Sequence, residues 1–279
     1  MFGQVAAGAS LGGLTGPLLS GVLVAPVGEP GLLLISTALL LLTLVFVQRL
    51  LGWRERMGPR ADGRPPERIA GSMWAGLTLI ARAPYLAAIA CFVLLLTTAT
   101  TFLYFEQARI VEATFPDRTR QTQVFAAIDA TVQALTILIQ LFFTGRLAKR
   151  LGVTVLLAAV PVTMLFGFGV LALAATFPVL ALVMIVRRVG EYALARPGRE
   201  MLFAPLDAET KYKAKNTVDT LVYRGGDLIS GWAYTGIVWV ASTAAVAIAG
   251  VVVAGVWAAV GYTIGRRHDR APETLSPAR

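Results

Sequence analysis

The sequence predicts an all-α integral membrane protein with eight transmembrane helices. Of its 279 residues, 56% are hydrophobic and only 15% are charged, and the mean hydropathy of +0.69 lies far above that of a soluble domain. A helix needs about 20 mostly apolar residues to cross a bilayer, and such runs occupy almost the whole chain. They lie near residues 2–26, 31–51, 84–105, 123–145, 152–175, 177–196, 216–239 and 242–265.

The distribution of basic residues predicts how these helices are oriented. The chain has 25 Lys and Arg residues and a formal net charge of +9. With the N-terminus inside, 19 of them fall in inside connectors, whereas only Arg109, Arg118 and Arg120 fall in outside connectors. This positive-inside asymmetry predicts that both termini are cytoplasmic, and the Ala-, Arg-, Gly- and Leu-rich composition suggests a bacterial inner membrane. The positive charge therefore indicates topology and not a nucleic-acid partner. The inside connectors are residues 49–82, 146–150, 196–215 and 266–279.

The first predicted span carries small residues at every fourth position. Gly8, Gly12 and Gly16 are followed by Pro17; this spacing lets two helices approach closely, and the proline is expected to add a kink. In the third span, the single cysteine, Cys91, is expected to be a small buried apolar residue.

A linker divides the predicted spans into two and six. Residues 53–68 are rich in Arg, Pro and Gly, and residues 69–82 fit an amphipathic helix on the cytoplasmic surface that ends at Pro84. The predicted domains are 1–52, the last two helices of an N-terminal bundle; 53–83, the basic linker and surface helix; 84–265, a major-facilitator-type six-helix C-terminal bundle; and 266–279, a cytoplasmic tail.

The uneven division raises the question of what completes the first bundle. Many transporters consist of two six-span bundles with the substrate between them. Only the last third of a first bundle is present before the linker here. We expect either that Met1 is an internal start, so that N-terminal helices are missing, or that a partner chain completes a reduced variant; the first alternative is favoured.

The fourth predicted span contains one polar stripe. Asp129, Gln133 and Gln140 fall on roughly the same side of the helix. The stripe favours a lined cavity, and the alternative is that Asp129 neutralises a structural arginine. Residues 145–152 after it are expected to form a tight basic turn that works as a conformational latch.

The sixth predicted span ends in a dense cluster of charges. Arg188 and Glu191 are spaced for an i, i+3 pair, and Arg196 and Glu200 for an i, i+4 pair. Arg187 is expected to find its partner on another helix, with Asp129 and Asp219 as the candidates. A guanidinium in this position could also bind a phosphate or carboxylate bidentately.

The seventh predicted span carries Asp219, Tyr223 and Asp227 at four-residue intervals, so they are expected to share one face. Arg224 and Asp227 are spaced for an i, i+3 pair, and the two glycines between them are expected to weaken the helix there. The preceding residues 207–215 form a basic segment, read either as a topology signal or as an electrostatic collector for anions.

These charged runs resemble the nucleotide translocases (ATP:ADP antiporter family) and their bacterial major-facilitator-like relatives. The resemblance implies a twelve-span fold and exchange or uptake of nucleotides without hydrolysis. The residues of this chain that match the charged positions of the family motif are Arg196, Arg199, Lys211, Lys215 and Asp219. After the second glycine the translocases usually carry a lysine, whereas this chain has Asp227, which would repel a polyphosphate. The residues that carry the resemblance are Glu191-Tyr-Ala-Leu-Ala-Arg196-Pro-Gly-Arg199-Glu200, Lys211-Tyr-Lys-Ala-Lys-Asn216 and Val218-Asp219.

The sequence therefore predicts a secondary transporter, or the C-terminal part of one, that moves an anionic or zwitterionic solute by alternating access, a nucleotide being one candidate. Its partners would be the lipid bilayer and that small charged solute. The alternative is a non-transporting scaffold or sensor that acts through partners. An enzyme is disfavoured, because there is one cysteine, one histidine and no GxxxxGK[ST] loop, and we predict no metal or cofactor. The candidate substrate-binding residues are Asp129, Arg187, Arg188, Glu191, Arg196, Arg199, Lys211, Lys215, Asp219, Tyr223, Arg224 and Asp227.

Overall fold

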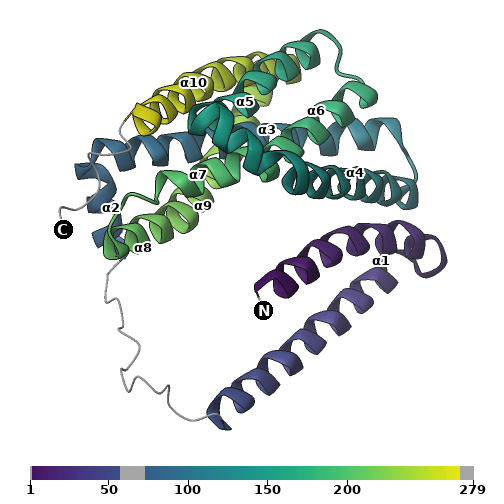
Figure 1. The fold of residues 1–279 in the computed structure, drawn as a ribbon. Helices are drawn as coiled ribbons and strands as arrows, with labels where there is room; N and C mark the ends of the chain where they lie inside the picture. The colour runs from purple at the N-terminus through teal and green to yellow at the C-terminus, as the bar shows by residue number, and fades with distance from the viewer. Residues whose placement is uncertain (1, 57–72, 271–279) are drawn as a thin grey trace.

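The computed structural model describes residues 2–56 and 73–270, and in this part of the chain it is helical with no strand (Figure 1). The all-α prediction is confirmed. Three π-helical segments, η1 to η3, interrupt the α-helices. The elements are α1 (Phe2–Arg56), α2 (Met73–Arg82), α3 (Pro84–Thr114), α4 (Arg118–Ile139), η1 (Gln140–Thr144), α5 (Gly145–Leu173), α6 (Phe177–Gly190), η2 (Glu191–Ala195), α7 (Arg196–Leu202), α8 (Ala208–Thr217), η3 (Val218–Val222), α9 (Tyr223–Val240) and α10 (Thr243–Arg270).

Helix α1 is a helical hairpin whose two arms correspond to the first two predicted spans (Figure 1). The chain reverses at Gly28, whose φ of 67° is accessible to glycine at little cost. The turn therefore lies at Gly28, and Pro17 lies inside the first arm, where the expected kink stays a prediction. The first arm packs against α4, and the second arm exposes large apolar side chains such as Leu34 and Phe46.

Five helices in the described residues are long and apolar enough to cross a membrane. The segments predicted as spans six and seven are absent from this set, since their many charged and polar residues leave no sufficiently apolar stretch of 18 residues. They run as α6–η2–α7 and α8–η3–α9. The eight-span count remains a prediction. The five apolar helices are Gly8–Arg54, Pro84–Thr114, Arg118–Phe143, Gly152–Leu173 and Thr243–Arg270.

The core of the bundle lies where α3, α5 and α10 meet. Phe92 and Trp257 are both buried, with ring centroids 5.6 Å apart. Gly261 allows the close approach of α10 to α5, because a Cβ there would lie 3.0 Å from the carbonyl oxygen of Leu157. Such close contact supplies van der Waals packing that lipid chains would not replace.

The glycine stripe of the first span packs against no helix of the described residues. A Cβ on Gly8, Gly12 or Gly16 would have no atom within 4 Å, because this stripe points away from the bundle. The packed face of α1 contains Gly13 and Gly21 instead, where a Cβ would lie 2.8 Å from Gln133 and 3.1 Å from Ala126.

Cys91 is exposed and not buried. Helix α3 turns Ile89, Phe92 and Val93 toward the core, which leaves Cys91 on the outer face.

The surface helix and the basic turn are also revised. Helix α2 confirms the helical prediction for residues 73–82, but Ile80 is buried and the helix packs against α8. Helix α1 extends to Arg56, so the start of the predicted linker is helical; residues 57–72 lie outside the described part. Residues 145–151 are helical and not a tight turn, and the backbone deviates only at Gly152, with a φ of 73°.

Candidate functional site

A basic cavity of about 500 Å³ lies among η2, α7, α8, η3 and α9. Two π-helical turns, η2 and η3, form part of its wall. A π-turn adds one residue to the local helical repeat and is frequent at functional sites, because it rotates the side chains that follow. The break expected at Gly225 and Gly226 therefore lies one turn earlier, at η3, while α9 is continuous through both glycines. The lining residues are Leu96, Glu191, Tyr192, Ala195, Arg196, Arg199, Glu200, Lys215, Asp219, Tyr223 and Arg224.

Ion pairs neutralise two of the four cations in the basic cavity. A guanidinium nitrogen of Arg199 lies 3.2 Å from Oδ1 of Asp219, and Nζ of Lys215 lies 2.6 Å from Oε2 of Glu200. Within the described residues, Arg196 and Arg224 have no carboxylate oxygen within 4.0 Å, and both are exposed. The cavity thus presents two guanidinium groups that form no ion pair with a carboxylate of the described residues and can bind an anion.

Both pairs predicted from spacing around this cavity are wrong. Glu200 pairs with Lys215 on α8 and not with Arg196 on its own helix. Asp227 does not pair with Arg224; it accepts a hydrogen bond of 3.4 Å from Thr101 on α3 and lines a different cavity. In each case a neighbouring helix supplies a partner that counting along one helix cannot find.

A second cavity, the arginine cavity, has a volume of about 490 Å³ and lies between α3, α4 and α6. The ion-pair partners of Arg187 and Arg188 are the reverse of those predicted. Arg187 pairs with Glu191 at 2.6 Å and donates a hydrogen bond of 2.8 Å to Thr100, while Arg188 pairs with Asp129. Residues four apart lie on one side of a helix, whereas Arg188 is rotated by about 100° and faces α4. Its lining residues are Thr100, Tyr104, Gln107, Ala108, Phe125, Asp129, Met184, Arg187 and Arg188.

A third cavity, the aromatic cavity, has a volume of about 540 Å³ and lies between α3 and α9. It shares Tyr223 with the basic cavity and Thr100 and Tyr104 with the arginine cavity. Asp219 and Asp227, expected on one face, are therefore divided between two cavities with Tyr223 between them. The lining residues are Thr100, Thr101, Tyr104, Phe105, Tyr223, Asp227, Leu228, Gly231, Trp232 and Thr235.

The polar stripe expected on α4 does not line one cavity. Asp129 faces the arginine cavity, Gln133 lies against Gly13 of α1, and Gln140 donates a hydrogen bond of 3.0 Å to the carbonyl oxygen of Tyr192. The alternative interpretation of Asp129, as the partner of an arginine, agrees with its pairing to Arg188.

The basic segment 207–215 retains little free charge. Asp207 caps α8 by accepting a hydrogen bond of 2.9 Å from the backbone N–H of Thr210, and this bond lowers the pKa of the Asp207 carboxyl. Lys213 pairs with Glu209, and Lys211 is not among the residues that line the basic cavity. No group of three or more His, Cys, Asp or Glu in the described ranges could hold a metal ion.

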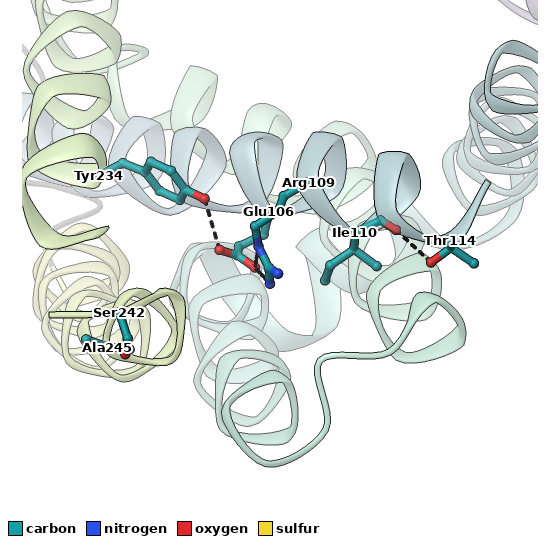
Figure 2. A network of polar contacts seen from close by, with 7 residues as sticks. All are labelled: Glu106, Arg109, Ile110, Thr114, Tyr234, Ser242 and Ala245. Carbon is teal, nitrogen blue, oxygen red and sulfur yellow. Dashed lines mark hydrogen bonds and ion pairs between the residues drawn. The ribbon is translucent and has the colours of Figure 1, made fainter. Parts of the chain in front are cut away.

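The sequence interpretation missed a buried polar network between α3 and α9 (Figure 2). Tyr234 donates a hydrogen bond of 3.0 Å to Oε1 of Glu106, and a guanidinium nitrogen of Arg109 lies 2.6 Å from Oε2. The side chain of Glu106 is only 8% exposed. The network was missed because the predicted third span ended at residue 105, whereas α3 continues to Thr114. The i, i+3 spacing of Glu106 and Arg109 was the available signal.

The model of one protein family matches most of the chain. This is the TLC ATP/ADP transporter family, and the match covers residues 31–267, from the second arm of α1 to α10 and including all three cavities. No curated protein matches the chain, and no solved structure does. Together with the long apolar helices, the match indicates a multi-pass membrane protein with the architecture of a transporter. The chain belongs to the TLC ATP/ADP transporter family.

Proposed function

We propose that this chain is a secondary transporter, or the substrate-binding part of one, that exchanges nucleotides across a bacterial inner membrane by alternating access. The observation that carries the proposal is the pair of unpaired guanidinium groups, Arg196 and Arg224, in the basic cavity. A charged group in a spanning segment costs roughly 2.5–3.5 kcal/mol on the insertion scale. The presence of charged residues there despite this cost indicates that the cavity binds a polar solute. Arginine also binds phosphate oxygens bidentately.

The two ion pairs in the basic cavity supply a means of coupling binding to movement. Arg199–Asp219 connects α7 to η3, and Lys215–Glu200 connects α7 to α8. A phosphate that enters the cavity competes with Asp219 and Glu200 for their cations. When the phosphate replaces these carboxylates as the partner of Arg199 and Lys215, the contacts that hold α7, α8 and η3 together would loosen. A ligand that binds one arrangement of these helices more tightly shifts the equilibrium toward that arrangement.

The test is counter-exchange by the full chain in liposomes loaded with ATP, measured as uptake of labelled ADP. The double variant Arg196→Ala, Arg224→Ala should reduce the exchange rate at least about tenfold, since each charged hydrogen bond contributes roughly 1.5–3 kcal/mol. Arg118→Ala is the matched control, because its side chain is 83% exposed and lies outside the three cavities. Wild-type exchange by the double variant, or no exchange by the wild-type chain, would contradict the proposal.

One observation favours the alternative of a scaffold that acts through partners. The second arm of α1 presents apolar side chains on every side, from Leu33 to Leu51, and no other described part of the chain covers them. Under this alternative the exposed guanidinium groups of Arg196 and Arg224 bind no solute, so the double variant Arg196→Ala, Arg224→Ala should leave the function intact. The transporter proposal predicts that the rate of nucleotide exchange falls at least about tenfold in the same variant.

A further inference from the structure

The aromatic cavity combines ring surfaces with a single carboxylate. Tyr104, Phe105, Tyr223 and Trp232 contribute rings, and Asp227 is the one carboxylic acid among the residues that line it. The wall is held in place from behind: Phe105 stacks on Tyr234 with centroids 4.7 Å apart, and the Tyr234 hydroxyl is bonded to Glu106. A stacking surface fixed in this way is suited to a flat, aromatic ligand.

Hydrocarbon is a poor occupant for this cavity. A lipid chain would meet the carboxyl group of Asp227 and the hydroxyls of Thr101 and Thr235, and polar groups that face acyl chains without hydrogen-bond partners are unfavourable whether or not they are charged. The hydrogen bond from Thr101 satisfies only part of the acceptor capacity of Asp227. The remaining lone pairs require N–H or O–H donors from water or from a ligand.

The aromatic cavity lies next to the basic cavity. Tyr223 lines both, so the two cavities adjoin at this side chain. The aromatic cavity, about 540 Å³, is within the range of small-molecule pockets. Its only charge is negative, whereas the unpaired charges of the basic cavity are positive. A molecule that is aromatic at one end and anionic at the other matches this arrangement.

We propose that the aromatic cavity holds the nucleobase of the transported nucleotide, and that Asp227 accepts a hydrogen bond from an N–H group on the edge of the base. The inference rests on the proposed function and adds the orientation and base selectivity of the ligand. Trp232 and the other rings stack on the base, and the phosphates lie against Arg196 and Arg224. The carboxylate at position 227 then does not oppose polyphosphate binding, because it faces the opposite end of the ligand.

The test is competition binding to the full chain in lipid nanodiscs, with ATP, purine riboside 5′-triphosphate and inorganic triphosphate as probes. Purine riboside has the purine ring of adenine without the exocyclic amine. The wild-type chain should bind ATP about tenfold or more tightly than the purine riboside analogue, since a site built to hydrogen-bond a donor rejects an analogue without it.

Two variants separate hydrogen bonding from stacking. Asp227→Leu should abolish the preference for ATP over the analogue without weakening the binding of inorganic triphosphate. Trp232→Ala should weaken both nucleotides at least about fivefold, since stacking of one base contributes roughly 1–3 kcal/mol, and should also leave triphosphate binding unchanged. Trp239→Ala is the matched control, because Trp239 lies on the same helix, is 88% exposed and is not in the cavity wall.

The outcomes distinguish the two proposals. If inorganic triphosphate binds and Asp227→Leu keeps the full preference for ATP, the base assignment is wrong and the anion site stands. If neither triphosphate nor ATP binds the wild-type chain, the proposed function itself fails. Loss of triphosphate binding in Asp227→Leu or Trp232→Ala would also overturn the assignment, because these residues are inferred to contact only the base.

Discussion

At the residue scale, the pairing of Arg187 with Glu191 is the most deeply buried ion pair among the described residues. The side chains are 7% and 16% exposed, and the contact is 2.6 Å. Removing one partner of a buried pair leaves an uncompensated charge and typically costs about 3–5 kcal/mol. Glu191→Gln should therefore lower the thermal unfolding temperature of the purified chain in detergent markedly.

A matched control for that prediction is Glu209→Gln. Glu209 also pairs with a cation four residues away, Lys213, but its side chain is 69% exposed, so its loss should change stability by less than about 1 kcal/mol. Replacing both Arg187 and Glu191 by leucine should restore part of the stability lost in the single variant. Equal stability of Glu191→Gln and Glu209→Gln would show that the buried pair contributes no more to the free energy of unfolding than the exposed pair.

The residue types of the site could be read from the sequence, but their partners could not. Charges within apolar runs are conspicuous, and most of the candidates line one of the three cavities. Partner choice depends on how neighbouring helices are rotated and shifted, as with Arg188 and Asp129, which are 59 residues apart. Counting along one helix finds only intrahelical pairs, and for Glu191 it offers two arginines, Arg188 at i−3 and Arg187 at i−4; the structure forms the second, which the sequence interpretation passed over.

At the element scale, hydropathy located the helices well but could not locate their interruptions. Apolar runs of about 20 residues identify spans because the bilayer fixes their length. The π-turns η2 and η3 interrupt helices at positions for which the sequence carries no clear signal, whereas the reversal at Gly28 falls in the connector predicted between residues 26 and 31. The charged spans six and seven consequently contain irregularities that were expected only near two glycines.

One such interruption, at Gly152, is stabilised from another helix. Asp269, near the end of α10, accepts hydrogen bonds from the backbone N–H groups of Val153 and Thr154 at 2.9 and 3.0 Å, which caps the helix that begins there. Asp269→Ala should cost about 0.5–2 kcal/mol, the usual contribution of an N-cap. The measurement is the free energy of unfolding in a denaturant titration.

Gly152→Ala tests the same junction from the opposite side. The φ of 73° disfavours any Cβ, and the new atom would lie 2.6 Å from a carboxylate oxygen of Asp269. Destabilisation of at least about 1 kcal/mol is expected. Gly169→Ala is the matched control, because Gly169 lies within the same helix and a Cβ there meets no atom within 4 Å; it should be neutral or stabilising. An unaffected Gly152→Ala variant would show that the junction is not strained.

At the scale of the whole molecule, the connectors divide into two groups at opposite ends of the bundle (Figure 1). At one end, the hydroxyl of Tyr85 donates a hydrogen bond of 2.9 Å to the carbonyl oxygen of Leu202 and lies 3.5 Å from Nδ1 of His268. At the other end, the rings of Phe115 and Phe177 meet edge to face, 5.0 Å apart. These contacts bring together connectors that the charge distribution assigns to one side of the membrane, which favours spans six and seven crossing it fully.

Cysteine labelling can decide this topology directly. In a Cys91→Ala background, Ala113→Cys would stand at the end that we expect outside, and Ala208→Cys at the end that we expect inside; both positions are exposed. A membrane-impermeant maleimide added to intact cells should label position 113 only, and permeabilised cells should be labelled at both. The physical basis is the positive-inside asymmetry: the connector that contains residue 208 is rich in Lys and Arg and resists translocation. Labelling of position 208 in intact cells would show that the orientation is the opposite of the one expected, and that the basic cavity meets its substrate from the other side of the membrane.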